Sequence, residues 1–228
     1  MKSLSSPSKL SLAIDTTSRD LCIALSRGTE VIFAHKDASG LQQSERLFPL
    51  IEEALQAAEI TFEQVDNFLV VTGPGSFTGL RAGIASVQGL ARSVGKKEFG
   101  VSTFDALAYA ANIINQPIGI ILNASRGDVY FGVRIVSEDE SVSICGSDSI
   151  LSIDALPSKI SELNLAFVIS TMPEIELNFS TKSSLIDATT INLAEILAGK
   201  AASISKDSAY ENALPYYLRL SDAEVNLK

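Results

Sequence analysis

The stretches AIDTTSRDLCIALS (residues 13–26) and ILNASRGDVYFGVR (residues 121–134) share one pattern, and this pattern decides the fold class. Each is an apolar strand, a short polar turn that contains Ser-Arg, and a second apolar strand. Strands and helices follow both hairpins in a similar order, so the sequence predicts two copies of one α/β lobe. Two short hairpins also resemble each other by chance, and the sequence alone leaves that alternative open.

The duplication predicts a boundary between the lobes near Val101. The first lobe then covers residues 1–101 and holds the glycine-rich loop and the helices expected to dock a partner. The second lobe covers residues 102–228, and its tail, with ALPYYLRL at 213–220, is expected to cross back onto the first. Apolar residues on one helical face predict the helices, at 44–58, from the glycine-rich loop to about 94, and at 104–114.

Composition restricts the function classes. The 228 residues carry a net charge of −9, whereas a protein that binds nucleic acid by itself is usually basic. The basic cluster Arg92, Lys96 and Lys97 reads as a solvated helix end or as a local patch for RNA. No apolar run approaches the roughly 20 residues that span a bilayer. Residues 1–9 are polar and unlike a signal peptide, so a cytoplasmic protein with no membrane contact is expected.

The loop GPGSFTGLR (residues 73–81) is the most distinctive motif. Gly73 and Gly75 allow backbone conformations that other residues avoid, and Ser76 or Thr78 can cap the helix that follows. A helix start with free N–H groups can hold a phosphate, but neither a Walker loop nor a Rossmann fingerprint is present. An anion site and a capped tight turn are therefore both open.

Small residues form a stripe along the helix after this loop. The spacing of three and four residues places them on one face, separate from an apolar face that should meet the lobe's own core. The members of the stripe are Gly79, Ala82, Ser86, Gly89 and Ser93. Such a stripe lets a second helix approach closely, and that helix belongs either to this chain or to a partner.

Candidate catalytic residues are few. Asp15 ends the first strand, a place where a carboxylate often faces a phosphate or a metal ion. An aspartate that only forms the turn after the strand would produce the same sequence pattern, so both interpretations are open. Its counterpart in the second hairpin is the uncharged Asn123. His35 is the only histidine, so a two-histidine metal site cannot be built, and no motif supports a Ser-His-Asp or Cys-His site.

Six motifs in order give a resemblance to a known family. They are IDTT (14–17), QSERLFPLI (43–51), GPGSFTGLR (73–81), GVSTFDALA (100–108), NASRGDVYFG (123–132) and PYYLR (215–219). Together they resemble the TsaB (YeaZ) family, which serves threonylcarbamoyladenosine synthesis on tRNA. The resemblance covers nearly the whole chain. It implies a two-lobed actin-like ATPase (ribonuclease-H-like) duplication.

The resemblance also implies a role without catalysis. TsaB-like proteins dock onto a TsaD-type transferase through helices of the first lobe, a TsaE-type ATPase joins them, and tRNA is reached only via the complex. The metal-binding histidine pair of TsaD-type enzymes would fall at Thr103 and Leu107, which are not histidines. Gln43 stands where the family usually has histidine, and Asn123 where it usually has aspartate. No cofactor or metal is therefore expected on the isolated chain, and any nucleotide would sit at the partner interface.

Specific residues follow for each expected site. The expected interface residues are Arg46, Leu47, Leu50, Gly79, Ala82, Ser86, Gly89 and Ser93. The weaker candidates for cofactor binding are Asp15, Gly73, Gly75 and Ser76. The same interface is expected to allow a two-fold homodimer. The alternatives are a nucleotide-dependent enzyme of the actin-like class, such as a small kinase, and a metallopeptidase.

Overall fold

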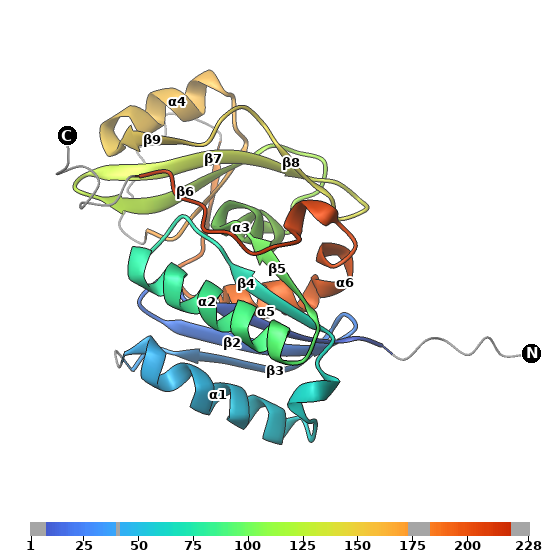
Figure 1. The fold of residues 1–228 in the computed structure, drawn as a ribbon. Coiled ribbons are helices and arrows are strands. Elements are labelled where there is room, and N and C mark those ends of the chain that lie inside the picture. The colour runs from blue at the N-terminus through green and yellow to red at the C-terminus, as the bar shows by residue number, and fades with distance from the viewer. Residues whose placement is uncertain (1–7, 40–41, 173–182, 220–228) are drawn as a thin grey trace, which may run out of the picture.

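The computed structural model describes residues 8–39, 42–172 and 183–219. Two mixed β-sheets lie one above the other, with helices between them and on their outer faces (Figure 1). The lower sheet has the strand order β3-β2-β1-β4-β5, and the upper sheet has the order β11-β10-β6-β7-β8.

The first sheet begins with an antiparallel meander and continues with parallel strands. Its strands are β1 (Leu10–Asp15), β2 (Leu21–Arg27), β3 (Glu30–Asp37), β4 (Asn67–Val71) and β5 (Lys97–Val101). β1 pairs antiparallel with β2 and parallel with β4, so it lies at the centre of the sheet. All six residues of β1 are buried, as expected for a strand that is covered on both faces.

The second sheet repeats this arrangement. Its strands are β6 (Ile118–Ser125), β7 (Asp128–Val136), β8 (Val142–Ile144), β9 (Ser149–Ser152), β10 (Phe167–Ser170) and β11 (Ser184–Asp187). β6 pairs antiparallel with β7 and parallel with β10, as β1 does with β2 and β4. The five strands in order therefore match those of the first sheet, with β9 as an addition beside β7.

This repetition of strand order and direction confirms the duplication predicted from the two hairpins. Each lobe has three antiparallel strands followed by two parallel ones, which is the ribonuclease-H-like arrangement. The chain has the two-lobed, actin-like fold that the resemblance implied.

Two helices cover the outer face of the first sheet. They are α1 (Gln43–Ala57) and α2 (Phe77–Ser93). Leu50 and Ile51 of α1 and Ile84 and Val87 of α2 pack with the outward side chains of the sheet in one apolar core. Pro49 is the seventh residue of α1 and therefore lies inside the helix. The 3₁₀ turn Phe62–Gln64 leads from α1 to β4.

The two inner helices are exchanged between the lobes. α3 (Thr103–Ala111) follows the first sheet in sequence but packs on β6 and β7 of the second. α5 (Leu193–Gly199) follows the second sheet but packs on β1 and β2 of the first. α3 and α5 also contact each other, so one continuous core joins the lobes. The sequence range expected for the second lobe thus supplies a helix to the first.

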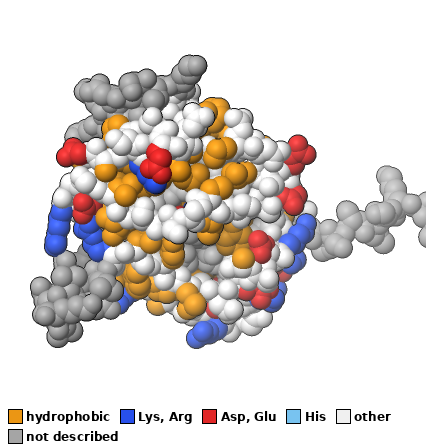
Figure 2. All heavy atoms as spheres, turned by 90° about the horizontal axis from the view of Figure 1, so that it is seen from above, with side chains coloured by type: hydrophobic (Ala, Val, Ile, Leu, Met, Phe, Trp, Pro, Cys, Tyr) orange, Lys and Arg blue, Asp and Glu red, His pale blue; other side chains and the backbone are white. Residues whose placement is uncertain are grey.

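The outer face of the second sheet is covered by one short helix, α4 (Leu156–Glu162). Apolar side chains gather on this side of the molecule (Figure 2). Ile144 of β8 is 61% exposed. α4 follows the 3₁₀ turn Ile153–Ala155, and α6 (Ala201–Ile204) and the 3₁₀ turn Ser208–Tyr210 follow α5.

Residues 211–219 form no helix and no extended strand, although Glu211 makes an isolated bridge to Phe99. Residues 211–219, which we call the strap, run from α6 across the front of the molecule between α2 and the second sheet (Figure 1). The strap contacts both lobes, as the hydrogen bonds of Tyr216 to Thr72 and to Asp148 show. Residue 220 of the predicted tail lies outside the described residues.

Candidate functional site

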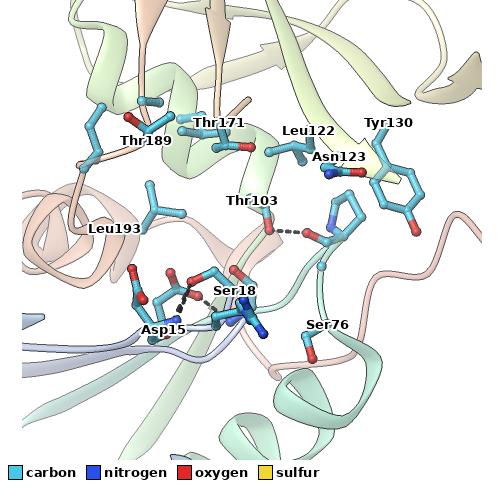
Figure 3. A pocket seen from close by; sticks show the side chains of 18 of the residues that line it. Asp15, Ser18, Ser76, Thr103, Leu122, Asn123, Tyr130, Thr171, Thr189 and Leu193 are labelled. Carbon is cyan, nitrogen blue, oxygen red and sulfur yellow. Dashed lines mark hydrogen bonds between the residues drawn. The ribbon is translucent and has the colours of Figure 1, made fainter. Parts of the chain in front are cut away.

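A cleft of about 600 Å³ lies between the lobes. Asp15 and Ser18 belong to its lower wall, and Leu122, Asn123 and Thr171 belong to its upper wall (Figure 3). These residues lie in the last part of a central strand of their lobe or just after it, which is where an α/β sheet normally places a ligand site. Tyr130 and Ser76 lie at one end of the cleft, and Thr189 lies at the other.

Asp15 and Asn123 occupy equivalent places in the two lobes and make equivalent bonds. Asp15 Oδ1 accepts a hydrogen bond from the backbone N–H of Thr17 at 2.8 Å. Asn123 Oδ1 accepts one from the backbone N–H of Ser125 at 2.7 Å. Both side chains therefore close the turn that follows their strand, and an uncharged side chain performs this role as well as a carboxylate.

Burial shifts the pKa of two groups at the base of the cleft. Burial raises the pKa of the Asp15 carboxyl, although hydrogen bonds from Thr17 oppose that rise. Burial also raises the pKa of the Cys22 thiol, so it stays protonated and weakly nucleophilic. Lys36 is held by Asp20 at 3.2 Å and by the carbonyl of Thr189 at 3.2 Å, which ties the two walls together.

The glycines of the loop allow close packing on the first hairpin. A Cβ on Gly75 would lie 2.5 Å from the carbonyl oxygen of Thr17, and a Cβ on Gly79 would lie 2.1 Å from that of Thr16. The N–H of Ser76 is used by Thr17, and the Ser76 hydroxyl caps α2 by accepting from the N–H of Gly79. The capped tight turn predicted from sequence is present, and the packing explains these glycines without an anion.

Three further residues in or beside the cleft, Gly73, Thr103 and Gln43, also have structural partners. Gly73 has a φ of 105°, which favours glycine, and its carbonyl accepts from the N–H of Thr103. Thr103 also donates its hydroxyl to the carbonyl of Pro74 at 2.8 Å. Gln43 donates to the carbonyls of Ser18 and Asp20 and so joins α1 to the first hairpin. In the described part of the chain, no three His, Cys, Asp or Glu side chains are placed to hold a metal ion.

Three residues expected at the partner interface are buried inside the first lobe. Leu47 and Leu50 project from α1 onto the sheet and are 2% and 0% exposed, because their helical face supplies the core. Gly79 lies beneath Thr16. These residues cannot contact a partner through their side chains, and this corrects that part of the sequence prediction.

The other expected interface residues do reach the surface. Ala82, Ser86 and Arg46 are partly exposed, and Gly89 and Ser93 are exposed. Outside the adjacent backbone of its own helix, no atom of the described chain lies within 4 Å of the position that a Cβ on Gly89 would take. At Gly89 the stripe is therefore not covered by any described helix of this chain, whereas Gly79, its first member, is covered by Thr16 of the first hairpin.

The sequence reading missed Phe48, which lies on α1 and is 50% exposed. Its neighbours Leu47 and Leu50 face the core, so Phe48 points away from it. The sequence did contain a signal for this exposed residue: a large aromatic side chain that falls outside the apolar face of an amphipathic helix. Arg46, beside it, is paired with Asp37 at 2.9 Å.

Comparisons with known proteins agree with this architecture. Residues 38–223 match the family model described as TsaD, tRNA N6-adenosine threonylcarbamoyltransferase. The chain is 28% identical over 164 residues to the tRNA threonylcarbamoyladenosine biosynthesis protein TsaB of Buchnera aphidicola, which covers 71% of this chain and 78% of that protein. It is 32% identical over 123 residues to TsaB of Escherichia coli, which covers 53% of this chain and 52% of that protein. The chain is a TsaB-type member of the TsaD family.

The solved structures show the same fold. YeaZ from Pseudomonas aeruginosa superposes with a TM-score of 0.73 at 23% identity and covers 92% of this chain and 100% of that chain. The sequence match spans about half the length of the TsaB proteins of Bacillus subtilis and Escherichia coli, at 53% and 52%. No described helix is both long and apolar enough to cross a membrane.

Proposed function

We propose that this TsaB-type chain is a non-catalytic partner subunit in threonylcarbamoyladenosine synthesis on tRNA. It docks onto a TsaD-type transferase through the outer face formed by α1 and α2. The TsaB names of its relatives support the pathway. The open surface at Gly89 is the observation that supports the place of docking, because a partner helix can approach the backbone of α2 there.

Phe48 strengthens the case for this face. Exposed aromatic side chains at a protein surface often provide much of the binding energy when a partner covers them. Phe48 is half-exposed on α1, and the small residues from Ala82 to Ser93 lie on the neighbouring helix. A pair of packed partner helices would fit this face, because Phe48 offers an aromatic side chain to bury and the small residues of α2 allow a close approach.

The chemistry of the cleft supports a subunit without catalysis of its own. Asp15 accepts a hydrogen bond from Thr17, Asn123 makes the equivalent bond without a charge, and the glycine-rich loop is packed on Thr16 and Thr17. A kinase would need a second acidic group in the upper wall, where Asn123 stands. Nothing specific in the site favours the kinase or the metallopeptidase.

The rest of the assembly follows from this role. A TsaE-type ATPase joins through the complex, any nucleotide sits at the partner interface, and tRNA binds through the transferase. The net charge of −9 agrees with weak tRNA binding by the chain alone. In the absence of the transferase, the α1–α2 face is free to pair with a second copy around a two-fold axis.

Co-purification with a TsaD-type transferase tests the proposal. Gly89→Leu should reduce the affinity at least about tenfold, because the new side chain keeps the partner helix away, while the melting temperature should rise slightly through helix propensity and should not fall. Phe48→Ser should weaken binding in the same way. Ser161→Leu, on the exposed side of α4 in the other lobe, is the matched control and should bind normally.

The transfer assay completes the test. The transferase should need this chain for full activity, and Gly89→Leu should lose that stimulation in proportion to the lost binding. Normal affinity of both Gly89→Leu and Phe48→Ser would show that the partner docks elsewhere. Transfer by this chain without the transferase would show that it is an enzyme.

A further inference from the structure

The strap connects the two lobes through residues that lie close together in sequence. The backbone N–H of Tyr216 donates to the carbonyl of Thr72, at the end of β4 in the first lobe, at 2.8 Å. The hydroxyl of the same residue donates to Asp148 of the second lobe at 2.7 Å. One residue therefore bridges the lobes at the loop that leads into α2.

The strap is fixed to the first lobe along its length. Gln88 of α2 donates to the carbonyl of Ala213 at 2.8 Å, and Lys97 of β5 pairs with Glu211 at 2.6 Å. Arg81 of α2 donates to the hydroxyl of Tyr217 at 3.0 Å. The fit is tight at Gly100, where a Cβ would lie 2.7 Å from the Cα of Ala213.

The side chains of only two strap residues provide the polar contacts to the second lobe that the described structure shows. Tyr216 reaches Asp148, which also forms two hydrogen bonds with the buried Arg134. Arg219 donates to the carbonyl of Ala124 at 2.9 Å and pairs with Asp128. Ala124 and Asp128 belong to the β6–β7 hairpin, the hairpin that supplies Asn123 and Tyr130 to the cleft.

These contacts lie at one end of the cleft. Tyr217 of the strap packs against the ring of Phe77, the residue after Ser76. Arg219 of the strap bonds to Ala124, the residue after Asn123. The strap therefore passes the end of the cleft where Ser76 and Tyr130 lie (Figure 3). Lys36 and Thr189 tie the walls together at the other end. Between the two ends the lobes meet through α3 and α5.

We propose that the strap is a latch: it stays on the first lobe and holds the β6–β7 hairpin in place through Tyr216 and Arg219, so releasing these two side chains opens the cleft. Because Arg81 and Gln88 of α2 hold the strap, the state of the cleft is linked to the helix on the outer face. The latch concerns the two lobes of this chain, so it does not depend on the proposed docking partner.

Hydrogen exchange on the full chain tests the latch. The double variant Tyr216→Phe, Arg219→Gln keeps the backbone contacts and the apolar packing of the strap and removes its side-chain bonds to Asp148 and Asp128. The amides of the β6–β7 hairpin tip (residues 123–128) and of the loop at 73–76 should then exchange about five to ten times faster, since local opening costs less. The amides of β1 and α2 should keep their rates.

Lys97→Gln is the matched control, because it removes a strap contact that lies wholly within the first lobe. It should leave exchange at the hairpin and the loop unchanged. Unchanged rates in the double variant would overturn the latch. Faster exchange over the whole chain, in the double variant and in Tyr216→Phe alone, would also overturn it, because the strap would then support the fold as a whole.

Discussion

Thr16 lies so close to Gly79 that a Cβ at residue 79 would be 2.1 Å from the Thr16 carbonyl oxygen. The Thr16 hydroxyl also donates to the carbonyl of Gly79 at 2.8 Å. The first hairpin and the start of α2 are therefore in direct backbone contact. This contact, together with the cap at Ser76, fixes where the helix begins.

Gly79→Ala should destabilise the fold by about 1–3 kcal/mol, because the methyl group meets a backbone oxygen that cannot move aside cheaply. Gly89→Ala makes the same change in the same helix, where the added Cβ has open space. It should stabilise the chain by about 0.5–1 kcal/mol through helix propensity. Urea unfolding of both variants measures these effects, and two effects of the same sign would refute the packing argument.

The stability of the Asp15→Asn variant relative to the parent chain should increase as the pH rises. Burial raises the pKa of Asp15, so the folded state disfavours the ionised carboxylate, and stability is lost as the pH rises through the folded pKa. Asparagine keeps the bond to Thr17, as Asn123 keeps the bond to Ser125, and carries no charge. Unfolding at pH 4 and pH 7.5 should show a relative gain for the variant at the higher pH; a loss that grows with pH would contradict this.

Arg46→Gln should cost stability at neutral pH, and this cost should shrink progressively as the pH falls below about 4. Hydrogen bonds from Ser39 and then the pairing with Arg46 lower the pKa of Asp37 below its ordinary value of 3.8. The stabilisation from this group is present above that value and is lost as the pH falls through the lower folded pKa. The pair is partly exposed, so the cost at pH 7 should be roughly 0.5 kcal/mol. Arg92→Gln, at an exposed position of α2, serves as the control and should show no such pH dependence.

Arg134→Met should cost about 3–5 kcal/mol, since it leaves Asp105 and Asp148 buried without their cation. Burial already raises the pKa of Asp105, although Arg134 opposes this rise. Arg134→Lys keeps the charge but cannot make two parallel bonds to Asp148, so it should restore only part of the loss. Thermal and urea unfolding report both, and a methionine variant as stable as the parent would exclude a structural role for this network.

Much of the fold could be predicted from local pattern. The two hairpins, the helices of the first lobe and the capped loop depend on apolar periodicity and turn-forming residues close in sequence. The boundary predicted near Val101 already placed α3 in the second lobe, on which it packs, but the packing of α5 on the first sheet could not be predicted, because this helix is apolar enough to pack on either sheet. Only the joint packing of the whole chain selects one arrangement.

Some features of the candidate site could likewise be predicted from the sequence, whereas others depended on the tertiary structure. The sequence by itself determined that a two-histidine metal site is impossible, because His35 is the only histidine, and that Asn123 carries no charge. The tertiary structure decided that Leu47, Leu50 and Gly79 are interior while Phe48 and Gly89 are open, and that Tyr216 bridges the lobes. Composition is a property of the residues alone, whereas exposure and bridging depend on segments far apart in sequence that meet only when the chain has folded.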